Sequence, residues 1–261
     1  MHTTEEKKAA FERLLGVLDT LREKCPWDRK QTNESLRPNT IEEVYELCDA
    51  LIKADDAEIR KELGDVLLHV CFYAKIGEEK GAFDIADVCN ALCDKLIYRH
   101  PHVYGDAVAE DAAAVSRTWE QVKLKEKGTT HTVLGGVPAA LPSLVKAYRI
   151  QDKARNAGFD WADRRDVWPK VREEIAEFEA EAEHMDGDRM EAEFGDLLFS
   201  LINAARLYKI KPDNALERTN QKFIRRFNYV EQQAKAQGKS LGEMTLGEMD
   251  ALWDEAKRQG L

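Results

Sequence analysis

Two stretches of the sequence repeat the same spacing of acidic residues. Residues 42–65 and 173–196 each open with two adjacent glutamates, add another glutamate three residues later, and close with Glu-x-x-Asp. The two sets are separated by 131 residues (173 − 42 and 196 − 65). They consist of Glu42, Glu43, Glu46, Glu62 and Asp65, and of Glu173, Glu174, Glu177, Glu193 and Asp196.

Carboxylates at these spacings lie on one side of a helix. At about 100° per residue, the first three glutamates of each set span a sector of roughly 100°, and the closing Glu and Asp are about 60° apart. Two antiparallel helices joined by a short turn would bring both groups face to face. Such carboxylates repel one another unless a cation compensates their charge. Because all the ligands are oxygens, a hard ion such as Mg²⁺ or Mn²⁺ is expected.

A solvated acidic face is the alternative interpretation of each set. The chain has 49 acidic residues in 261, and an exposed like-charged pair costs only a few tenths of a kcal/mol. One set alone would leave the two interpretations evenly matched. The repetition favours the metal site, because matched basic and aromatic residues follow both sets.

These matched residues suit a phosphate chain. Lys95 and Arg99 correspond to Lys222 and Arg226 at an offset of 127 (222 − 95), and Trp119 and Lys123 correspond to Trp253 and Lys257 at an offset of 134 (253 − 119). Lysine and arginine opposite a metal would neutralise the charge that moves in phosphoryl transfer. The tryptophans could offer a face to a nucleobase. Core packing of the tryptophans and a solvated basic face remain the alternatives.

The second half has more basic residues near its acids. Arg225 adds to Lys222 and Arg226, and Lys170 lies three residues before Glu173, where the first half has Asn39. A well-placed cation stabilises an anionic leaving group. We therefore expect the second half to be the main catalytic site and the first half to be weaker, selective or structural.

The elements that position these residues are helices. Apolar residues recur at helical spacing through both acidic stretches, and sustained alternation typical of strands is lacking. Pro38 with Asn39 and Thr40 predicts the start of the first acidic helix, and Trp168-Pro169 predicts the start of its second copy. The sequence thus predicts an all-α tandem repeat of two helical-bundle domains, 1–127 and 143–261, with a Gly- and Pro-containing linker region at 128–142.

Composition limits the partners. The formal net charge of −10 disfavours general nucleic-acid binding. The apolar runs are far shorter than the ~20 residues that span a bilayer, and the acidic, amphipathic start of the chain is unlike a secretory signal. We expect a cytoplasmic protein that binds neither nucleic acid nor membrane.

With these motifs assembled, the chain resembles the MazG family of nucleoside triphosphate pyrophosphohydrolases in its two-domain bacterial form. The resemblance covers nearly the whole chain. It implies an all-α homodimer that dimerises through helices and uses Mg²⁺ to convert a nucleoside triphosphate to the monophosphate and pyrophosphate. The matching stretches are CPWDRKQT (25–32), EEVYE (42–46), ELGD (62–65), RHPHVYGD (99–106), EEIAE (173–177), EFGD (193–196) and KFIRRF (222–227).

The resemblance also implies residue roles. Glu173 is the candidate for orienting or deprotonating water, while Lys222, Arg226 and Lys257 would hold the departing pyrophosphate. Arg189 stands where the family often has Lys, and Ala192 where it often has Glu; these departures concern the phosphate contacts and not the metal cluster. The implied metal ligands are Glu43, Glu46, Glu62, Asp65, Glu174, Glu177, Glu193 and Asp196, and the implied nucleotide-site residues include Lys170, Glu173, Arg189, Lys222, Arg226, Trp253 and Lys257.

One alternative function belongs to a different class. A non-catalytic regulatory protein that senses nucleotides would need the same charged residues for binding. Both halves keep all five acids, which favours an enzyme.

Overall fold

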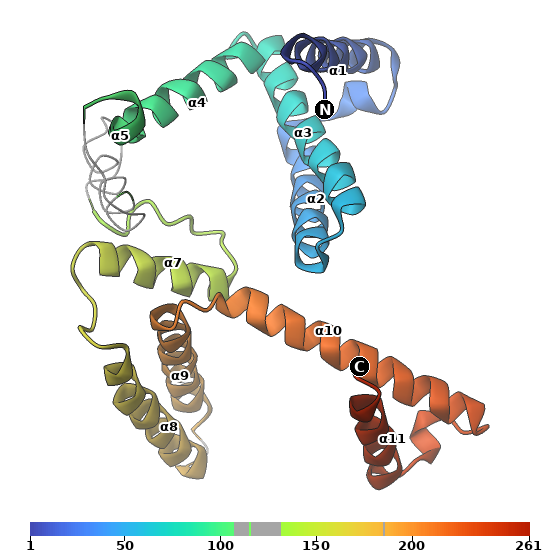
Figure 1. Cartoon of the computed structure of the whole chain (residues 1–261), viewed down its shortest axis with the longest axis vertical. Coiled ribbons are helices and arrows are strands. Elements are labelled where there is room, and N and C mark those ends of the chain that lie inside the picture. The colour runs from blue at the N-terminus through green and yellow to red at the C-terminus, as the bar shows by residue number, and fades with distance from the viewer. Residues whose placement is uncertain (107–114, 116–131, 185) are drawn as a thin grey trace. The chain divides into compact units, whose positions relative to one another are not determined.

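A computed structural model of the chain describes residues 1–106, 115, 132–184 and 186–261. Within these residues every regular element is helical, and the chain divides into two compact units, Met1–Val115 and Ser116–Leu261 (Figure 1). The predicted all-α tandem repeat is confirmed. The predicted boundary at residues 127 and 128 lies outside the described residues and stays a prediction. None of the helices in the described part is both long and apolar enough to span a membrane.

The N-terminal unit is built around an antiparallel helix pair. Helices α2 and α3 pack along each other, and the turn between them uses Ala54 in a left-handed conformation (φ 54°). Asp55 then caps α3 by accepting hydrogen bonds from the next backbone N–H groups. The elements of this unit are α1 (Thr4–Lys24), η1 (Asp28–Lys30), α2 (Asn33–Lys53), α3 (Asp56–Glu79), α4 (Ile85–Arg99) and α5 (Pro101–Tyr104).

The predicted start of the first acidic helix is wrong. Helix α2 begins at Asn33, and Pro38 lies inside it. Thr32 and Ser35 form a reciprocal capping box that satisfies N–H groups of the first turn. Pro38 is the sixth residue of α2, where proline removes one backbone hydrogen bond and its ring crowds the carbonyl four residues earlier. The helix nevertheless begins at the earlier cap.

The C-terminal unit repeats the helix pair and extends it. Helices α8 and α9 pack closely, α7 packs on α9, and α10 leaves the end of α9 and packs mainly against α11 (Figure 1). Val230, Ala234, Met244 and Leu252 form the core between α10 and α11. The elements are α7 (Ser143–Asn156), η2 (Arg164–Asp166), α8 (Val167–His184), α9 (Gly187–Leu207), α10 (Pro212–Ala236), η3 (Leu241–Glu243) and α11 (Leu246–Arg258).

Parts of the predicted apolar helix faces are exposed in the single chain. Val44 is 43% exposed and Leu63 is 52% exposed, although their spacing predicts burial. Leu198 and Leu201 on α9 are 44% and 42% exposed. The periodicity therefore identified apolar faces that neither unit covers with its own described helices.

Candidate functional site

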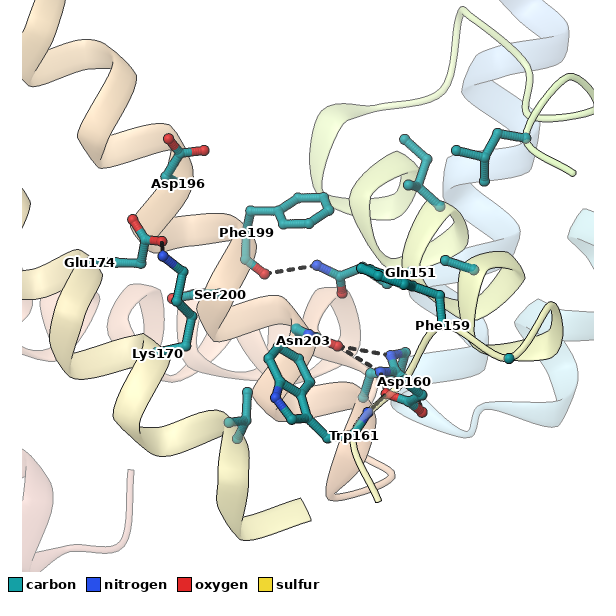
Figure 2. A pocket seen from close by; sticks show the side chains of 16 residues that line it. Gln151, Phe159, Asp160, Trp161, Lys170, Glu174, Asp196, Phe199, Ser200 and Asn203 are labelled. Carbon is teal, nitrogen blue, oxygen red and sulfur yellow. Dashed lines mark hydrogen bonds and ion pairs between the residues drawn. The ribbon is translucent and has the colours of Figure 1, made fainter. Parts of the chain in front are cut away.

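In the C-terminal unit, the α8–α9 pair brings three acids together. One carboxylate oxygen from each of Glu174, Glu177 and Glu193 lies within 4.8 Å of the other two. Glu174 is only 6% exposed, and Lys170 reaches it from one helical turn earlier, with Nζ 2.7 Å from its Oε1 (Figure 2). We call Glu174, Glu177 and Glu193 the C-terminal triad.

Desolvation and charge repulsion both act on this triad. Desolvation and the neighbouring Glu174 carboxylate raise the pKa of Glu177. Lys170 also pairs with Glu173 at 2.7 Å, and the two hydrogen bonds to Glu173 and Glu174 raise the pKa of Lys170. Lys170 is therefore a permanent cation beside a site with excess negative charge.

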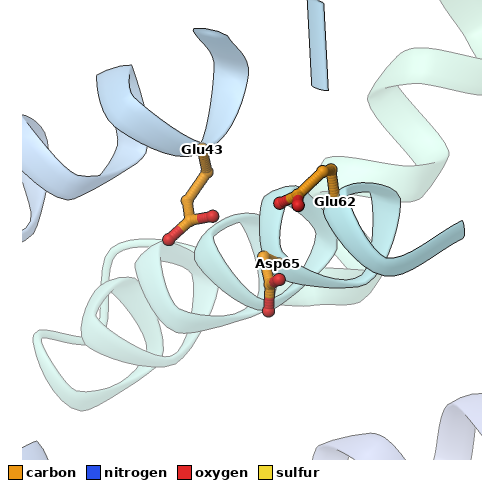
Figure 3. Close-up of side chains that lie close together, drawn as sticks. All are labelled: Glu43, Glu62 and Asp65. Atoms are coloured by element: carbon orange, nitrogen blue, oxygen red, sulfur yellow. The ribbon is translucent and has the colours of Figure 1, made fainter. Parts of the chain in front are cut away.

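The α2–α3 pair forms an N-terminal triad of Glu43, Glu62 and Asp65, whose oxygens also lie within 4.8 Å of one another (Figure 3). Its first two members correspond to Glu174 and Glu193 of the C-terminal triad, whereas Asp65 corresponds to Asp196. Glu62 is 3% exposed, and its Oε1 accepts a hydrogen bond from Lys61 at 2.6 Å. Desolvation, followed by the charges of Asp65, Glu46 and Glu62, raises the pKa of Glu43. Both halves thus gather acids at the repeat spacing.

The donor set of both triads fits a hard divalent cation. All the donors are carboxylate oxygens, which Mg²⁺ and Mn²⁺ prefer. In the N-terminal triad, Oε2 of Glu62 is buried and has no hydrogen-bond partner. An unpaired buried carboxylate oxygen is costly, and a bound cation would satisfy it. Glu46 and Asp196, two further predicted ligands, lie outside the triads.

A cavity of about 650 Å³ borders the C-terminal triad (Figure 2). Lys170, Glu174 and Asp196 line its charged end, whereas Gln151 and Trp161 line the rest together with apolar side chains. Sequence reasoning missed this part of the site. The available signal was Gly158-Phe-Asp-Trp161, two aromatic residues around an aspartate shortly before the second acidic helix.

The pocket beside the N-terminal triad has a different lining. It measures about 550 Å³ and lies between the end of α2 and the start of α3. Its lining is mainly charged, with Asp49, Lys53, Glu58 and Lys61 beside Glu62. Similar acid triads therefore border dissimilar pockets.

The predicted basic and aromatic residues of the second half form a separate group on α10 and α11. Lys222 and Arg225 are exposed on α10. Arg226 donates from Nε to the Leu261 carbonyl at 2.7 Å and lies 5.7 Å from the Trp253 ring centroid. Lys257 pairs with Asp254 at 2.9 Å. None of the predicted residues in this group lines the described cavity.

The remaining predicted site residues have mixed positions. Arg189 has a side chain that is 70% exposed and approaches Asp186 at 3.5 Å. Lys95 and Arg99 lie on α4. Trp119 and Lys123 lie outside the described residues.

Comparison with known proteins gives a consistent result over almost the whole chain. The model of the MazG nucleotide pyrophosphohydrolase domain matches residues 31–104 and 164–231. A nucleoside triphosphate pyrophosphohydrolase of Escherichia coli (strain K12) is 42% identical over 256 residues, which cover 95% of this chain and 97% of that protein. The Thermotoga maritima nucleoside triphosphate pyrophosphohydrolase/pyrophosphatase MazG is also 42% identical, over 97% of this chain and 98% of its own. An uncharacterised Bacillus subtilis protein, YabN, is 48% identical over 89% of this chain and 48% of its own.

Proposed function

This chain belongs to the MazG nucleotide pyrophosphohydrolase family, and we propose that it hydrolyses nucleoside triphosphates to nucleoside monophosphates and pyrophosphate. The observation that supports this most is the C-terminal triad at the edge of a cavity of about 650 Å³. Pockets of roughly 300–1,000 Å³ are typical of small-molecule sites. We propose the C-terminal triad as the main catalytic site.

The metal ligands would be Glu174, Glu177 and Glu193, with Asp196 at the edge of the same cavity as a further oxygen donor. Mg²⁺ or Mn²⁺ held there would polarise the α-phosphoryl group and lower the pKa of a bound water. The N-terminal triad would hold a cation in the same way. Its role would be weaker, selective or structural.

Glu173 is the proposed base for the attacking water. Its side chain is 55% exposed, and it is held by Lys170 at 2.7 Å. A carboxylate in this position can accept a proton from water. Lys170 thereby connects the proposed base to the buried ligand Glu174.

Lys222, Arg226 and Lys257 would hold the departing pyrophosphate. Because they do not line the cavity of their own chain, we infer that they reach the phosphates of a site in a second copy. A homodimer is supported by the exposed apolar faces, such as Leu198 and Leu201 on α9. A second helical surface would remove these side chains from water.

The test is product analysis in ¹⁸O-labelled water with Mg²⁺. Attack at the α-phosphate should put the label in the nucleoside monophosphate and leave the pyrophosphate unlabelled. Release of a nucleoside diphosphate and orthophosphate, or full activity in excess chelator, would contradict the proposal. Binding without turnover would instead support a nucleotide-sensing regulatory protein.

A further inference from the structure

The cavity beside the C-terminal triad changes in character along its length. One end carries the charged residues Lys170, Glu174 and Asp196 (Figure 2). Farther along α9, Asn203 lies seven residues beyond Asp196, about 10 Å along the helix axis at ~1.5 Å per residue. A nucleoside can extend over such a distance. Phosphates would therefore lie at the charged end, with the rest of the nucleotide farther along the cavity.

The other end of the cavity carries a balanced charge. Arg206, which is 6% exposed, binds both oxygens of Asp160, with Nη1 2.9 Å from Oδ2. Burial alone would raise the pKa of Asp160, but the hydrogen bonds and charge of Arg206 outweigh it and keep the pKa below its ordinary value. Because this pair neutralises itself, this end suits an uncharged group better than a phosphate.

The same ion pair positions an aromatic wall. Gly158 has a φ of +94°, which only glycine adopts readily, and it turns the chain out of α7. Asp160 then ties the following segment to α9 through Arg206. Phe159 and Trp161, on either side of Asp160, line the cavity. Trp161 is 39% exposed and Phe159 is 84% exposed, and accessible aromatic rings at a pocket are suited to stacking on a nucleobase.

Gln151 supplies an unpaired acceptor in this pocket. The residue is 5% exposed, and its Nε2 donates to the Phe199 carbonyl at 2.8 Å (Figure 2). This bond orients the amide, yet Oε1 is buried without a hydrogen-bond partner. Buried acceptors usually have a partner. A ligand donor would satisfy this atom.

Asn203 complements this acceptor. Its Oδ1 accepts from Nε and Nη2 of Arg206 at 3.0 and 2.7 Å. These two bonds fix the orientation of the amide. Its other polar atom is Nδ2, which is a hydrogen-bond donor. An acceptor and a donor lining one pocket match the donor–acceptor edge of a nucleobase.

We propose that this cavity is the nucleobase subsite, and that Oε1 of Gln151 accepts a hydrogen bond from the base edge. This subsite proposal rests on the proposed function only in assuming that the ligand is a nucleotide. The subsite would require a donor on the base and an aromatic face to stack on it.

The test is calorimetric binding to the full chain with Mg²⁺, which needs no turnover. We expect uridine monophosphate to bind about 10- to 100-fold more tightly than N3-methyluridine monophosphate, because the methyl group removes the donor and leaves Oε1 unpaired. Ribose 5-phosphate, which lacks a base, should bind more weakly than uridine monophosphate. Equal affinities for the two uridine nucleotides, or for ribose 5-phosphate, would overturn the proposal.

Variants separate hydrogen bonding from steric exclusion. Gln151→Met keeps the side-chain length but removes the acceptor, so the preference for uridine over N3-methyluridine should fall toward unity. Gln237→Met, an exposed change near the end of α10, should keep the wild-type ratio. An unchanged ratio in Gln151→Met would overturn the role of Gln151. Turnover of uridine triphosphate is measured separately, so a failure of the proposed hydrolysis would not be confused with a failure of the subsite.

Discussion

The two acid triads are drawn from the same repeated set of acids and share two equivalent positions, Glu43/Glu174 and Glu62/Glu193, but their surroundings are unlike. The C-terminal triad borders a cavity with aromatic walls and a buried amide, while the N-terminal triad borders a mainly charged pocket between two helix ends. A cation site needs only a few oxygens, which a repeated motif can supply. A site for the rest of a nucleotide needs a shaped cavity. Duplication of the acids therefore does not imply duplication of the whole site.

The neighbouring lysines differ as well. Lys170 bridges Glu173 and Glu174 across one helical turn, so it links a triad member to the proposed base. Lys61 pairs with the adjacent residue Glu62 and leaves Oε2 of that buried carboxylate without a partner. We infer that the first half depends more on a bound cation for its local stability.

The largest expected effect is on catalysis. Glu177→Gln should lower hydrolysis by roughly 100- to 1,000-fold, because a metal contributes several kcal/mol to the transition state and each 1.36 kcal/mol is a factor of ten. Glu46→Gln, at the equivalent position of the first half, should lower the rate of hydrolysis by a smaller factor. Steady-state rates on several triphosphates measure both. Glu179→Gln, an exposed change on α8, is the control.

Should Glu46→Gln be the more damaging change for every substrate, the assignment of the main site to the second half would be wrong.

The next effect is on stability. Asp160→Asn leaves the buried Arg206 guanidinium without its ion-pair partner and should cost about 3 kcal/mol, since breaking a buried pair typically costs this much. Glu79→Gln breaks the comparable pair with Arg22, but the Glu79 side chain is 39% exposed, so the cost should be about 1 kcal/mol or less. Denaturant unfolding compares the two variants. Equal losses would show that the two pairs contribute alike.

Acid titration tests the same two pairs. The pKa values of Asp160 and Glu79 lie below their ordinary values of 3.8 and 4.5. Their contribution to stability is therefore present above those ordinary values and is lost as the pH falls through the lower folded-state values. Asp160→Asn should flatten this part of the wild-type pH–stability curve. A curve parallel to the wild type would argue against the pair.

A smaller effect is expected from the basic group on α10. Lys222→Ala should lower hydrolysis by roughly 10- to 100-fold, the value of one charge-assisted phosphate contact. Lys235→Ala, farther along the same helix, should be near wild type. If the site is shared between copies, mixing Lys222→Ala with Glu177→Gln should restore activity above that of either variant. Failure to restore it would place Lys222 and the triad in one chain.

The smallest effect concerns charge repulsion in the first half. Without Mg²⁺, Glu43→Gln should raise the free energy of unfolding by a few tenths of a kcal/mol, because it removes one of the mutually repelling carboxylates. With Mg²⁺, Glu43→Gln should instead be less stable than the wild type, because the variant lacks one of the carboxylates that would bind the ion. Thermal unfolding with and without the ion checks this. A Glu43→Gln variant less stable than the wild type without Mg²⁺ would contradict the repulsion.

The helical class and the gathering of acids were predictable from local patterns. Acidic residues one turn apart share a helix face in any helix, which agrees with Glu174 and Glu177 in one triad, although the equivalent Glu46 lies outside the N-terminal triad. The start of α2 was not predicted, because the capping box at Thr32 and Ser35 outweighs a proline signal. The pocket residues Gln151 and Asn203 were also missed, since each is an ordinary polar residue within a helix.

By itself, the sequence determined the repeated helical units, the family and the residue types that can hold a cation and a phosphate chain, because these depend on spacing along one or two neighbouring helices. Only the tertiary structure decided that one triad borders an aromatic cavity and the other a charged pocket. It also decided that Gln151 keeps an unpaired acceptor and that Lys222 lies outside the cavity of its own chain. Burial and pairing depend on contacts between helices distant in sequence, which periodicity within one helix does not specify.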